Sequence, residues 1–239
     1  MINMDFSRKS VKGKVIVDMY GSTKRTWPQR LTIITGECAC LIITYWFLFL
    51  GGNDSVHLPE GNFGRDVALF AISVATFLRM GFMVLYLLRR GIQWSEVYGV
   101  LFAFAVYYIG FAVLGGIQDK PLDGVDLLAI SLFVIGSVIN SASEWLRDRW
   151  KNDPANQGKV YTGGLFRYAT HINYFGDIVW VCGFALLTRN IWALFIPLFL
   201  ILMFVFLNIP HHDQYLRGKY GEAFVAYEKK TKKLIPFIY

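Results

Sequence analysis

The sequence has little charge and little cysteine. Only 17% of its 239 residues are charged, whereas 55% are hydrophobic and 17% are aromatic. An ordinary soluble domain needs a more polar surface than this, so the composition excludes that class and is typical of a polytopic membrane protein.

Motifs for metals, soluble nucleotide folds and nucleic acid are also missing. Cys38, Cys40 and Cys182 lie in apolar segments without zinc-site spacing, so we interpret them as packing residues and expect no metal. There is no G-x-G-x-x-G after a strand and no Walker sequence. The net charge of +7 comes from basic residues beside hydrophobic spans, which favours a role in membrane topology over a nucleic-acid partner.

Six apolar segments are predicted to cross the bilayer, near residues 31–50, 67–88, 97–115, 125–150, 174–187 and 191–209. Residues 1–30 lack the apolar core of a cleaved signal and are predicted to be a basic, interfacial arm. We therefore predict an all-α membrane helix bundle in one domain, 31–239, and expect a monomer. Such a multi-pass protein belongs in the endoplasmic reticulum of a eukaryote or the inner membrane of a bacterium.

The basic residues predict the orientation of this bundle. The segments 1–30, 89–90, 141–171 and 211–239 hold 7, 2, 5 and 6 of the 24 lysines and arginines. The loops on the other side hold only Arg65, Lys120 and Arg189. By the positive-inside rule, both termini are expected to be cytosolic.

Polar residues at helical spacing gather at the predicted cytosolic ends of three spans. They are Asn140, Glu144, Arg147 and Lys151 on the fourth, Asn173 and Asp177 on the fifth, and His211 and Tyr215 after the sixth. Each pair alone is typical of a helix end facing solvent. Together with Lys159, the glycines of the Gly-Gly pair at 163–164 and Arg167, they predict a phosphate-binding pocket formed mainly by residues 135–239.

Two charged residues, Glu37 and Arg79, lie within predicted spans, where an ionisable group is costly unless it is paired or functional. Their expected depths are about 9 Å and about 15 Å at 1.5 Å per residue. A structural Glu37–Arg79 salt bridge and a substrate-facing Glu37 are therefore both open.

The C-terminal half resembles the steroid 5-alpha-reductase family. The resemblance rests on G-G-L-F-R-Y-A-T-H-I-N-Y-F-G-D from residue 163, H-H-D-Q-Y from residue 211 and the ending L-I-P-F-I-Y, and covers residues 135–239. It implies a membrane reductase in steroid or lipid metabolism that uses NADPH to reduce a carbon–carbon double bond conjugated to a carbonyl. The substrate would be a lipid-like enone that enters from the bilayer.

The resemblance also implies roles for individual residues. The family's cofactor site falls on Asn140, Glu144, Lys159, Asn173, Asp177, His211 and Tyr215. A glutamate of an early span, matched by Glu37, binds the substrate carbonyl together with a tyrosine, which we assign to Tyr86. A neutral acid there would stabilise the charge that builds on the carbonyl oxygen.

The sequence departs from the family in two respects. An alternative function also stays open. Gly36 stands where a glutamine commonly precedes the glutamate, and one N-terminal span is missing. The alternative is an S-adenosylmethionine-dependent membrane methyltransferase of the isoprenylcysteine or phospholipid type. Those enzymes carry R-H-P where this chain has Thr170-His171-Ile172, which favours the reductase.

Overall fold

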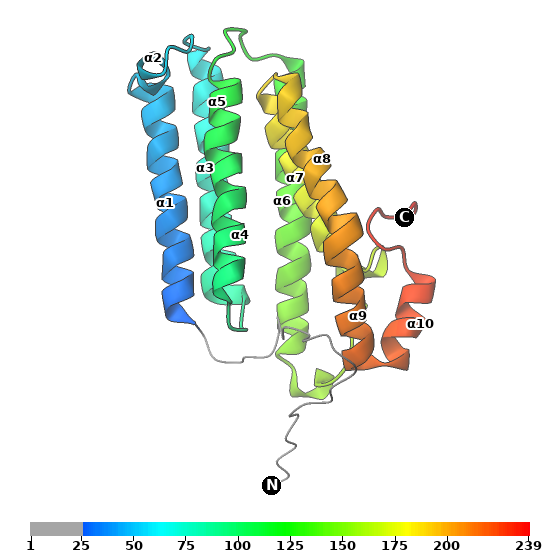
Figure 1. The fold of residues 1–239 in the computed structure, drawn as a ribbon. Helices are drawn as coiled ribbons and strands as arrows, with labels where there is room; N and C mark the ends of the chain where they lie inside the picture. Colours follow the sequence, from blue (N-terminus) through cyan, green and yellow to red (C-terminus); the bar gives the residue numbers. More distant parts are fainter. Residues whose placement is uncertain (1–25) are drawn as a thin grey trace.

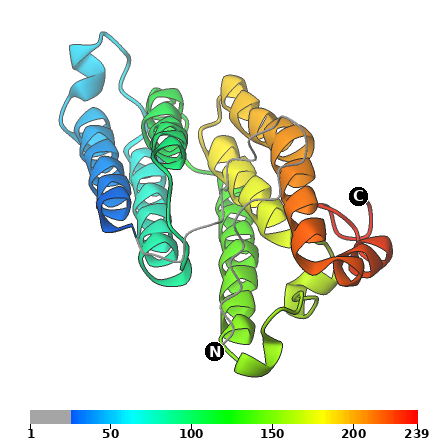
Figure 2. The same ribbon diagram turned by 60° about the horizontal axis from the view of Figure 1, so that its bottom comes forward.

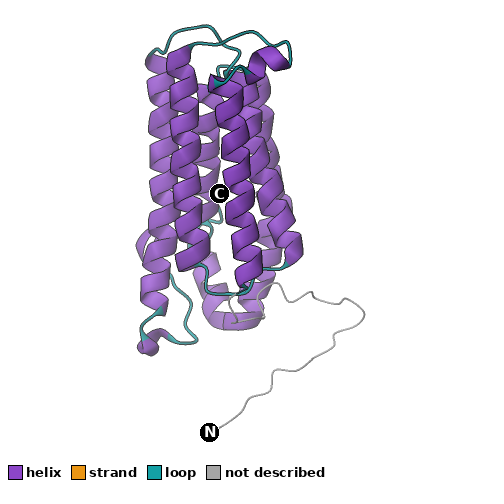
Figure 3. Ribbon diagram, turned by 90° about the vertical axis from the view of Figure 1, so that its left-hand side faces the viewer, coloured by secondary structure: helices purple, strands orange, loops and turns teal. Residues whose placement is uncertain are grey.

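The computed structural model describes residues 26–239, and within that range the protein is a bundle of helices without a named strand (Figure 3). Most of the predicted basic arm, residues 1–25, lies outside the described residues. Five helical rods, at 27–49, 63–87, 94–115, 124–151 and 191–220, are long and apolar enough to cross a membrane. The helix Ile172–Leu187 is apolar but shorter. The prediction of an all-α polytopic membrane bundle is confirmed.

The first half of the bundle consists of three packed rods (Figures 1 and 2). The first is α1 (Trp27–Phe49), which is followed by the short α2 (Gly52–Ser55). The second is α3 (Phe63–Phe82), which continues through a π-helical turn at Met83–Leu87. The third joins α4 (Trp94–Ala105), a π-helical turn at Val106–Gly110 and α5 (Phe111–Gly115).

The second half contains α6, α7 and a long composite helix (Figure 1). Its α6 (Gly124–Lys151) begins at a capping box formed by Asp123 and Asp126. Two short 3-10 turns, Pro154–Asn156 and Gly164–Arg167, lead to α7 (Ile172–Leu187). A third 3-10 turn, Ile191–Leu194, leads into α8 (Phe195–Met203), a π-helical turn at Phe204–Asn208 and α9 (Ile209–Tyr220). The helix α10 (Glu222–Lys230) follows after Gly221.

The last rod differs from its predicted end. The sequence predicted a span over 191–209 and then a polar tail, but the helix continues without a break to Tyr220. Pro210 does not end the rod; it lies directly after the π-helical turn Phe204–Asn208, where the regular hydrogen-bond pattern of the α-helix is already altered. The rod therefore carries the polar residues after position 210 beyond the apolar segment.

Two buried arginines link segments at opposite ends of the bundle. Arg30 is fully buried and donates to the carbonyl oxygens of Leu88, at 2.6 Å, and Arg90, at 2.9 Å. At the other end of the bundle, buried Arg65 pairs with Asp126 at 2.6 Å and also donates to the Leu187 carbonyl. These contacts satisfy carbonyl groups left open at helix ends, so each arginine links segments distant in sequence.

The closest helix contact joins α6 to α7 through glycine. A Cβ atom at Gly136 would lie 2.3 Å from the Trp180 amide nitrogen, and one at Gly176 would lie 2.6 Å from the Asn140 amide nitrogen. A third glycine, Gly183, would place a Cβ 2.5 Å from the Phe133 amide nitrogen. Only glycine fits at these positions, so the two backbones touch along most of α7.

We predict that Gly176→Ala destabilises the protein by about 1–3 kcal/mol, because the added methyl group must push the α6 and α7 backbones apart. Thermal unfolding in detergent micelles, followed by circular dichroism, measures the effect. The matched control is Gly99→Ala on α4, where an added Cβ would have no neighbour within 4 Å. Equal melting temperatures for the two variants would contradict the proposed backbone contact.

Candidate functional site

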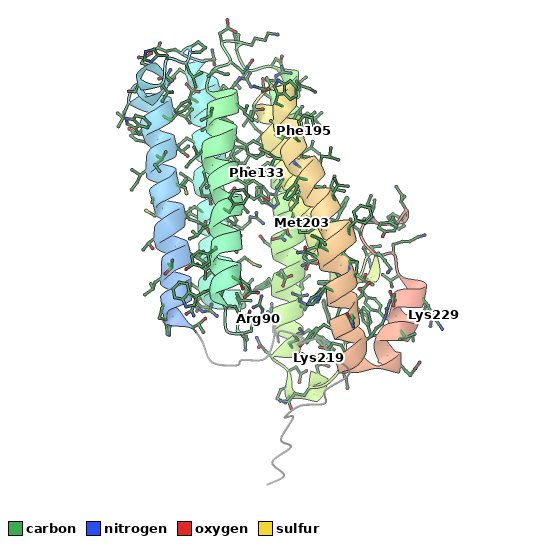
Figure 4. All side chains as sticks on the ribbon, in the orientation of Figure 1. Arg90, Phe133, Phe195, Met203, Lys219 and Lys229 are labelled. Carbon is green, nitrogen blue, oxygen red and sulfur yellow. The ribbon has the colours of Figure 1, made fainter. Side chains whose placement is uncertain are left out.

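A cleft of about 520 Å³ opens at the end of the bundle that carries Arg89, Arg90 and Lys219, here called the cleft end. Its walls come from the end of the second rod, from α6, from the segment before α7, and from α9 and α10. Figure 4 shows Arg90 and Lys219 at this end, on opposite halves of the bundle. The volume lies in the usual range for a small-molecule or cofactor site.

The cleft combines cations with aromatic rings. Its basic lining residues are Arg89, Arg90, Arg147, Lys151 and Lys219, and its aromatic and imidazole lining residues are Tyr161, Phe166, His212, Tyr215, Tyr220, Phe224 and Tyr227. Two acidic residues, Glu144 and Asp148, partly balance the charge. An excess of cations beside flat rings suits a ligand that carries both phosphate groups and an aromatic base.

The predicted cofactor residues divide into three groups by position. Glu144 and Tyr215 line the cleft. Asn140, Asn173 and Asp177 lie deeper in the bundle, on the facing sides of α6 and α7. Lys159 and His211 are exposed and are not among the cleft-lining residues.

His212 takes the place in the cleft that the sequence assigned to His211. Neighbouring residues on an α-helix point about 100° apart, so only one of the two histidines can face the cleft. The ring of His212 stacks against Tyr215, with ring centroids 6.4 Å apart. The i, i+4 spacing selected His211, which lies outside the cleft lining, and a cofactor role at this helix end stays a prediction.

A chain of hydrogen bonds connects the cleft with the interior of the bundle. Arg79 donates to the Asn140 side-chain oxygen at 2.8 Å, and the Asn140 amide donates to the Asn173 carbonyl at 3.1 Å. The Asn173 amide then donates to Glu144 at 2.9 Å, and Glu144 pairs with Arg147 in the cleft. These five residues, here called the polar chain, place an intramembrane cation in contact with the cleft wall.

The guanidinium of Arg79 is held at its position by more than Asn140. It lies over the Trp180 ring, 4.8 Å from the ring centroid, and the Trp180 indole nitrogen donates to Asp177 at 2.9 Å. Arg79 interacts electrostatically with both Asp177 and Glu37. Its Nε and Nη2 atoms are buried and have no hydrogen-bond partner in the described part of the chain.

Glu37 is fully buried and accepts a hydrogen bond of 3.0 Å from the Tyr108 hydroxyl. Its other oxygen, Oε1, is buried without a partner among residues 26–239. Because nearly all buried polar atoms in proteins are satisfied, such an oxygen marks a place where a ligand can bind. Glu37 and Arg79 form no ion pair in the described residues, so the predicted alternative of a structural salt bridge is not the arrangement found.

The hydroxyl beside Glu37 belongs to Tyr108 and not to Tyr86. Tyr86 is 72% exposed and stacks on Phe82 at the outer surface, whereas Tyr108 is fully buried. Tyr108 lies in the π-helical turn at Val106–Gly110, a local widening of the helix that is common at functional sites. The sequence offers several tyrosines within spans, and no local pattern distinguishes the inward-facing one.

Gly36 leaves room for an apolar neighbour beside the acid. A Cβ at this position would lie 2.4 Å from Cδ2 of Leu101, so the Leu101 side chain fills the space that a larger residue would need. The neighbour of Gly36 is therefore apolar, at the position where the family commonly has a glutamine.

A set of polar contacts that no sequence pattern predicted holds the wall of the cleft. Buried His171 contacts Asp213 through Nε2 and Oδ1 at 2.8 Å, and Lys233 pairs with the other Asp213 oxygen at 3.2 Å. The Tyr227 hydroxyl donates to the Phe166 carbonyl, and burial raises the pKa of this phenol, so it stays protonated. The three segments meet only in the tertiary structure, so spacing could not reveal them.

These features define a polytopic membrane protein with a cationic cleft at one end and a buried carboxyl–phenol pair inside. Residues 74–231 match a family described as "protein of unknown function (DUF1295)". The chain belongs to this family, which is similar to the steroid 5-alpha-reductases.

Curated relatives support the same assignment. The chain is 34% identical over 191 residues to 3-oxo-5-alpha-steroid 4-dehydrogenase 2 of Sus scrofa, covering 76% of this chain and 72% of that protein. It is 29% identical over 151 residues to 3-oxo-5-alpha-steroid 4-dehydrogenase 1 of Mus musculus, covering 58% and 57%. For the Homo sapiens type 1 protein the values are 34% over 125 residues, covering 51% and 45%. The chain thus spans about half the length of the mouse and human relatives.

We predict that Asn140→Leu costs about 1–3 kcal/mol of stability, because it leaves a buried Arg79 donor unpaired. Thermal unfolding measures the loss. Ser137→Ala on the same helix is the control, because the buried Ser137 hydroxyl has no partner among the described residues.

The double variant Arg79→Met/Asn140→Leu sharpens this test of the polar chain. Removing both partners of the Arg79–Asn140 bond should recover part of the loss, because no unpaired guanidinium remains. Strictly additive losses would show that Asn140 does not act through Arg79.

Proposed function

We propose that the protein is a membrane-embedded reductase that uses NADPH to reduce a carbon–carbon double bond conjugated to a carbonyl in a lipid substrate. The observation that carries the proposal is the Glu37–Tyr108 pair, a buried carboxyl–phenol site with one unpartnered oxygen. The similarity to proteins named as steroid dehydrogenases supports it independently.

The donor set of the cleft fits NADPH. Arg147, Lys151 and Lys219 would hold its phosphate groups, and the tyrosine rings would stack on its adenine. Asn140, Asn173 and Glu144 offer amide and carboxylate groups further in, where a carboxamide could bind. When bound, the cofactor would supply a hydride to the beta carbon of the enone.

The residues of the buried pair would act on the carbonyl oxygen. A protonated Glu37 can donate a hydrogen bond to this oxygen, and the Tyr108 hydroxyl can support either partner. Arg79 interacts electrostatically with Glu37 and would stabilise negative charge as it develops. In a water-poor site such fixed donors contribute strongly to lowering a barrier.

The apolar surroundings of the pair favour a lipid substrate without selecting one. Leu101 packs over Gly36, so recognition beside that residue would depend on shape and not on a polar contact. Steroid, sterol, polyprenal and enoyl thioester substrates are the candidates for an activity screen with NADPH. We further propose that the cleft end faces the cytosol, because most lysines and arginines gather there.

Thermal unfolding in the presence of NADPH tests the cofactor. A ligand that binds only the folded state adds about 2.7 kcal/mol of stability at one hundred times its Kd. We expect NADPH to raise the melting temperature and S-adenosylmethionine to leave it unchanged. A shift with S-adenosylmethionine alone would favour the methyltransferase and reject the reductase.

Two adjacent histidines provide a matched control for this measurement. His212→Ala removes a ring from the cleft and should weaken NADPH binding by roughly tenfold, equivalent to about 1.4 kcal/mol. His211→Ala alters an exposed side chain and should leave the affinity unchanged. The opposite pattern would show that the cofactor binds elsewhere.

For the chemical step, we predict that Tyr108→Phe and Glu37→Gln lower kcat by roughly 10²–10³-fold, the usual effect of removing a donor from a developing oxyanion. The Kd of NADPH should change little, because neither residue lines the cleft. Tyr86→Phe is the control and should retain normal turnover, because Tyr86 lies at the outer surface. Equal loss of turnover in Tyr86→Phe would contradict the assignment to Tyr108.

A further inference from the structure

The segment after α10, residues 231–239, folds back along the bundle. The Thr170 amide donates to the Lys232 carbonyl at 2.8 Å, and the His171 amide donates to the Lys233 carbonyl at 2.9 Å. Leu234 is buried. The segment is thus attached at its beginning to the residues that lead into α7.

Beyond this attachment the segment rises from the cleft end toward the middle of the bundle. In Figure 4, Lys229 lies at the height of Arg90, near the end of the second rod. In the same orientation, the end of the chain in Figure 1 lies at the height of Met203, within the apolar part of the last rod. Figure 3, turned by 90° about the vertical axis, shows the same height.

The turn carries two largely exposed apolar side chains, and the ring of one of them, Phe237, contacts Tyr168 with the ring centroids 5.6 Å apart. Phe237 is 78% exposed and Ile238 is 74% exposed. Exposed side chains at neighbouring heights of the last rod, including Leu202 and Phe206, belong to a transmembrane helix and so contact lipid. Exposed side chains at that depth would contact lipid and not water.

The backbone of the segment is arranged for such a medium. The amides of Leu234 and Ile235 both donate to a main-chain carboxyl oxygen of Tyr239 at 2.7 Å, and the amides of Ile238 and Tyr239 donate to the Ile235 carbonyl. A closed turn of this kind satisfies polar backbone groups that hydrocarbon cannot hydrate. The turn can therefore present apolar side chains to lipid with a smaller desolvation cost for its backbone amides and carbonyls.

Lysines stand at the base of the turn. Lys229, Lys230 and Lys232 are exposed, and Lys229 lies near the rim of the bundle, where lipid headgroups are expected (Figure 4). A lysine near an anionic membrane surface contributes about 1 kcal/mol of attraction. Exposed cations at the rim and apolar side chains above them match the two layers of a membrane interface.

We infer that Phe237 and Ile238 insert their side chains into the bilayer, with the lysines of α10 and the residues that follow it contacting anionic headgroups. The inserted turn braces the cleft, because Lys232 and Lys233 bind the backbone before α7 and Lys233 also pairs with Asp213. The partner is the lipid of the leaflet at the cleft end. This insertion does not depend on the proposed reductase activity.

Spin labels test the insertion directly. A nitroxide attached to Ile238→Cys is measured in nanodiscs of phosphatidylcholine and phosphatidylglycerol, in a variant whose three native cysteines are replaced by alanine. Collision rates with oxygen, which enriches in lipid, are compared with those of a water-soluble nickel chelate. We expect high oxygen access and at least a tenfold lower nickel access than at a water-exposed site.

Two reference labels make the result decisive. Phe206→Cys reports the lipid face of the last rod, and Gln157→Cys reports an exposed loop residue at the cleft end. A label at Phe237→Cys gives a second reading if one substitution is not tolerated. Values like those of Gln157, or an immobilised label that neither reagent reaches, would overturn the inference, since they place the turn in water or against protein.

Discussion

The close packing of α6 against α7 determines where the other parts of the site lie. Gly136, Gly176 and Gly183 remove the side chains that would separate the two helices, so backbone lies against backbone. At this distance the Asn140 side chain reaches the Asn173 carbonyl across the contact. Without the glycines, the polar residues of the two helices would face each other across side chains and could not bond directly.

Four polar residues of α3, α6 and α7 are connected by hydrogen bonds inside the bundle. Arg79, Asn140, Asn173 and Glu144 form a continuous series of bonds from the interior to the cleft. Asparagine amides neither gain nor release a proton near neutral pH, so this series holds groups in position and does not conduct protons. The atoms left unpaired, Glu37 Oε1 and two nitrogens of Arg79, lie at its inner end. A site for a polar substrate group is consistent with their position.

The C-terminal region is bonded to the residues that lead into α7. His171, Asp213 and Lys233 come from three segments and meet in one cluster, in which His171 and Asp213 are buried and Lys233 is partly exposed. The chain end after Lys233 lies at the middle height of the bundle and not at the cleft end (Figure 1). The predicted polar tail is therefore part of the wall of the cleft.

Hydrophobic periodicity and composition determined the class of the protein, the positions of the main helices and the ends at which polar residues gather. These properties are local, because a bilayer imposes the same length and polarity on every span. The direction in which a side chain faces, however, is not a local property of the sequence. Only the tertiary structure placed Tyr108 beside Glu37, left Tyr86 at the outer surface and turned His212 into the cleft in place of His211. A residue on an apolar helix faces protein or lipid according to how the helix rotates against its neighbours, and that rotation follows from packing between distant segments.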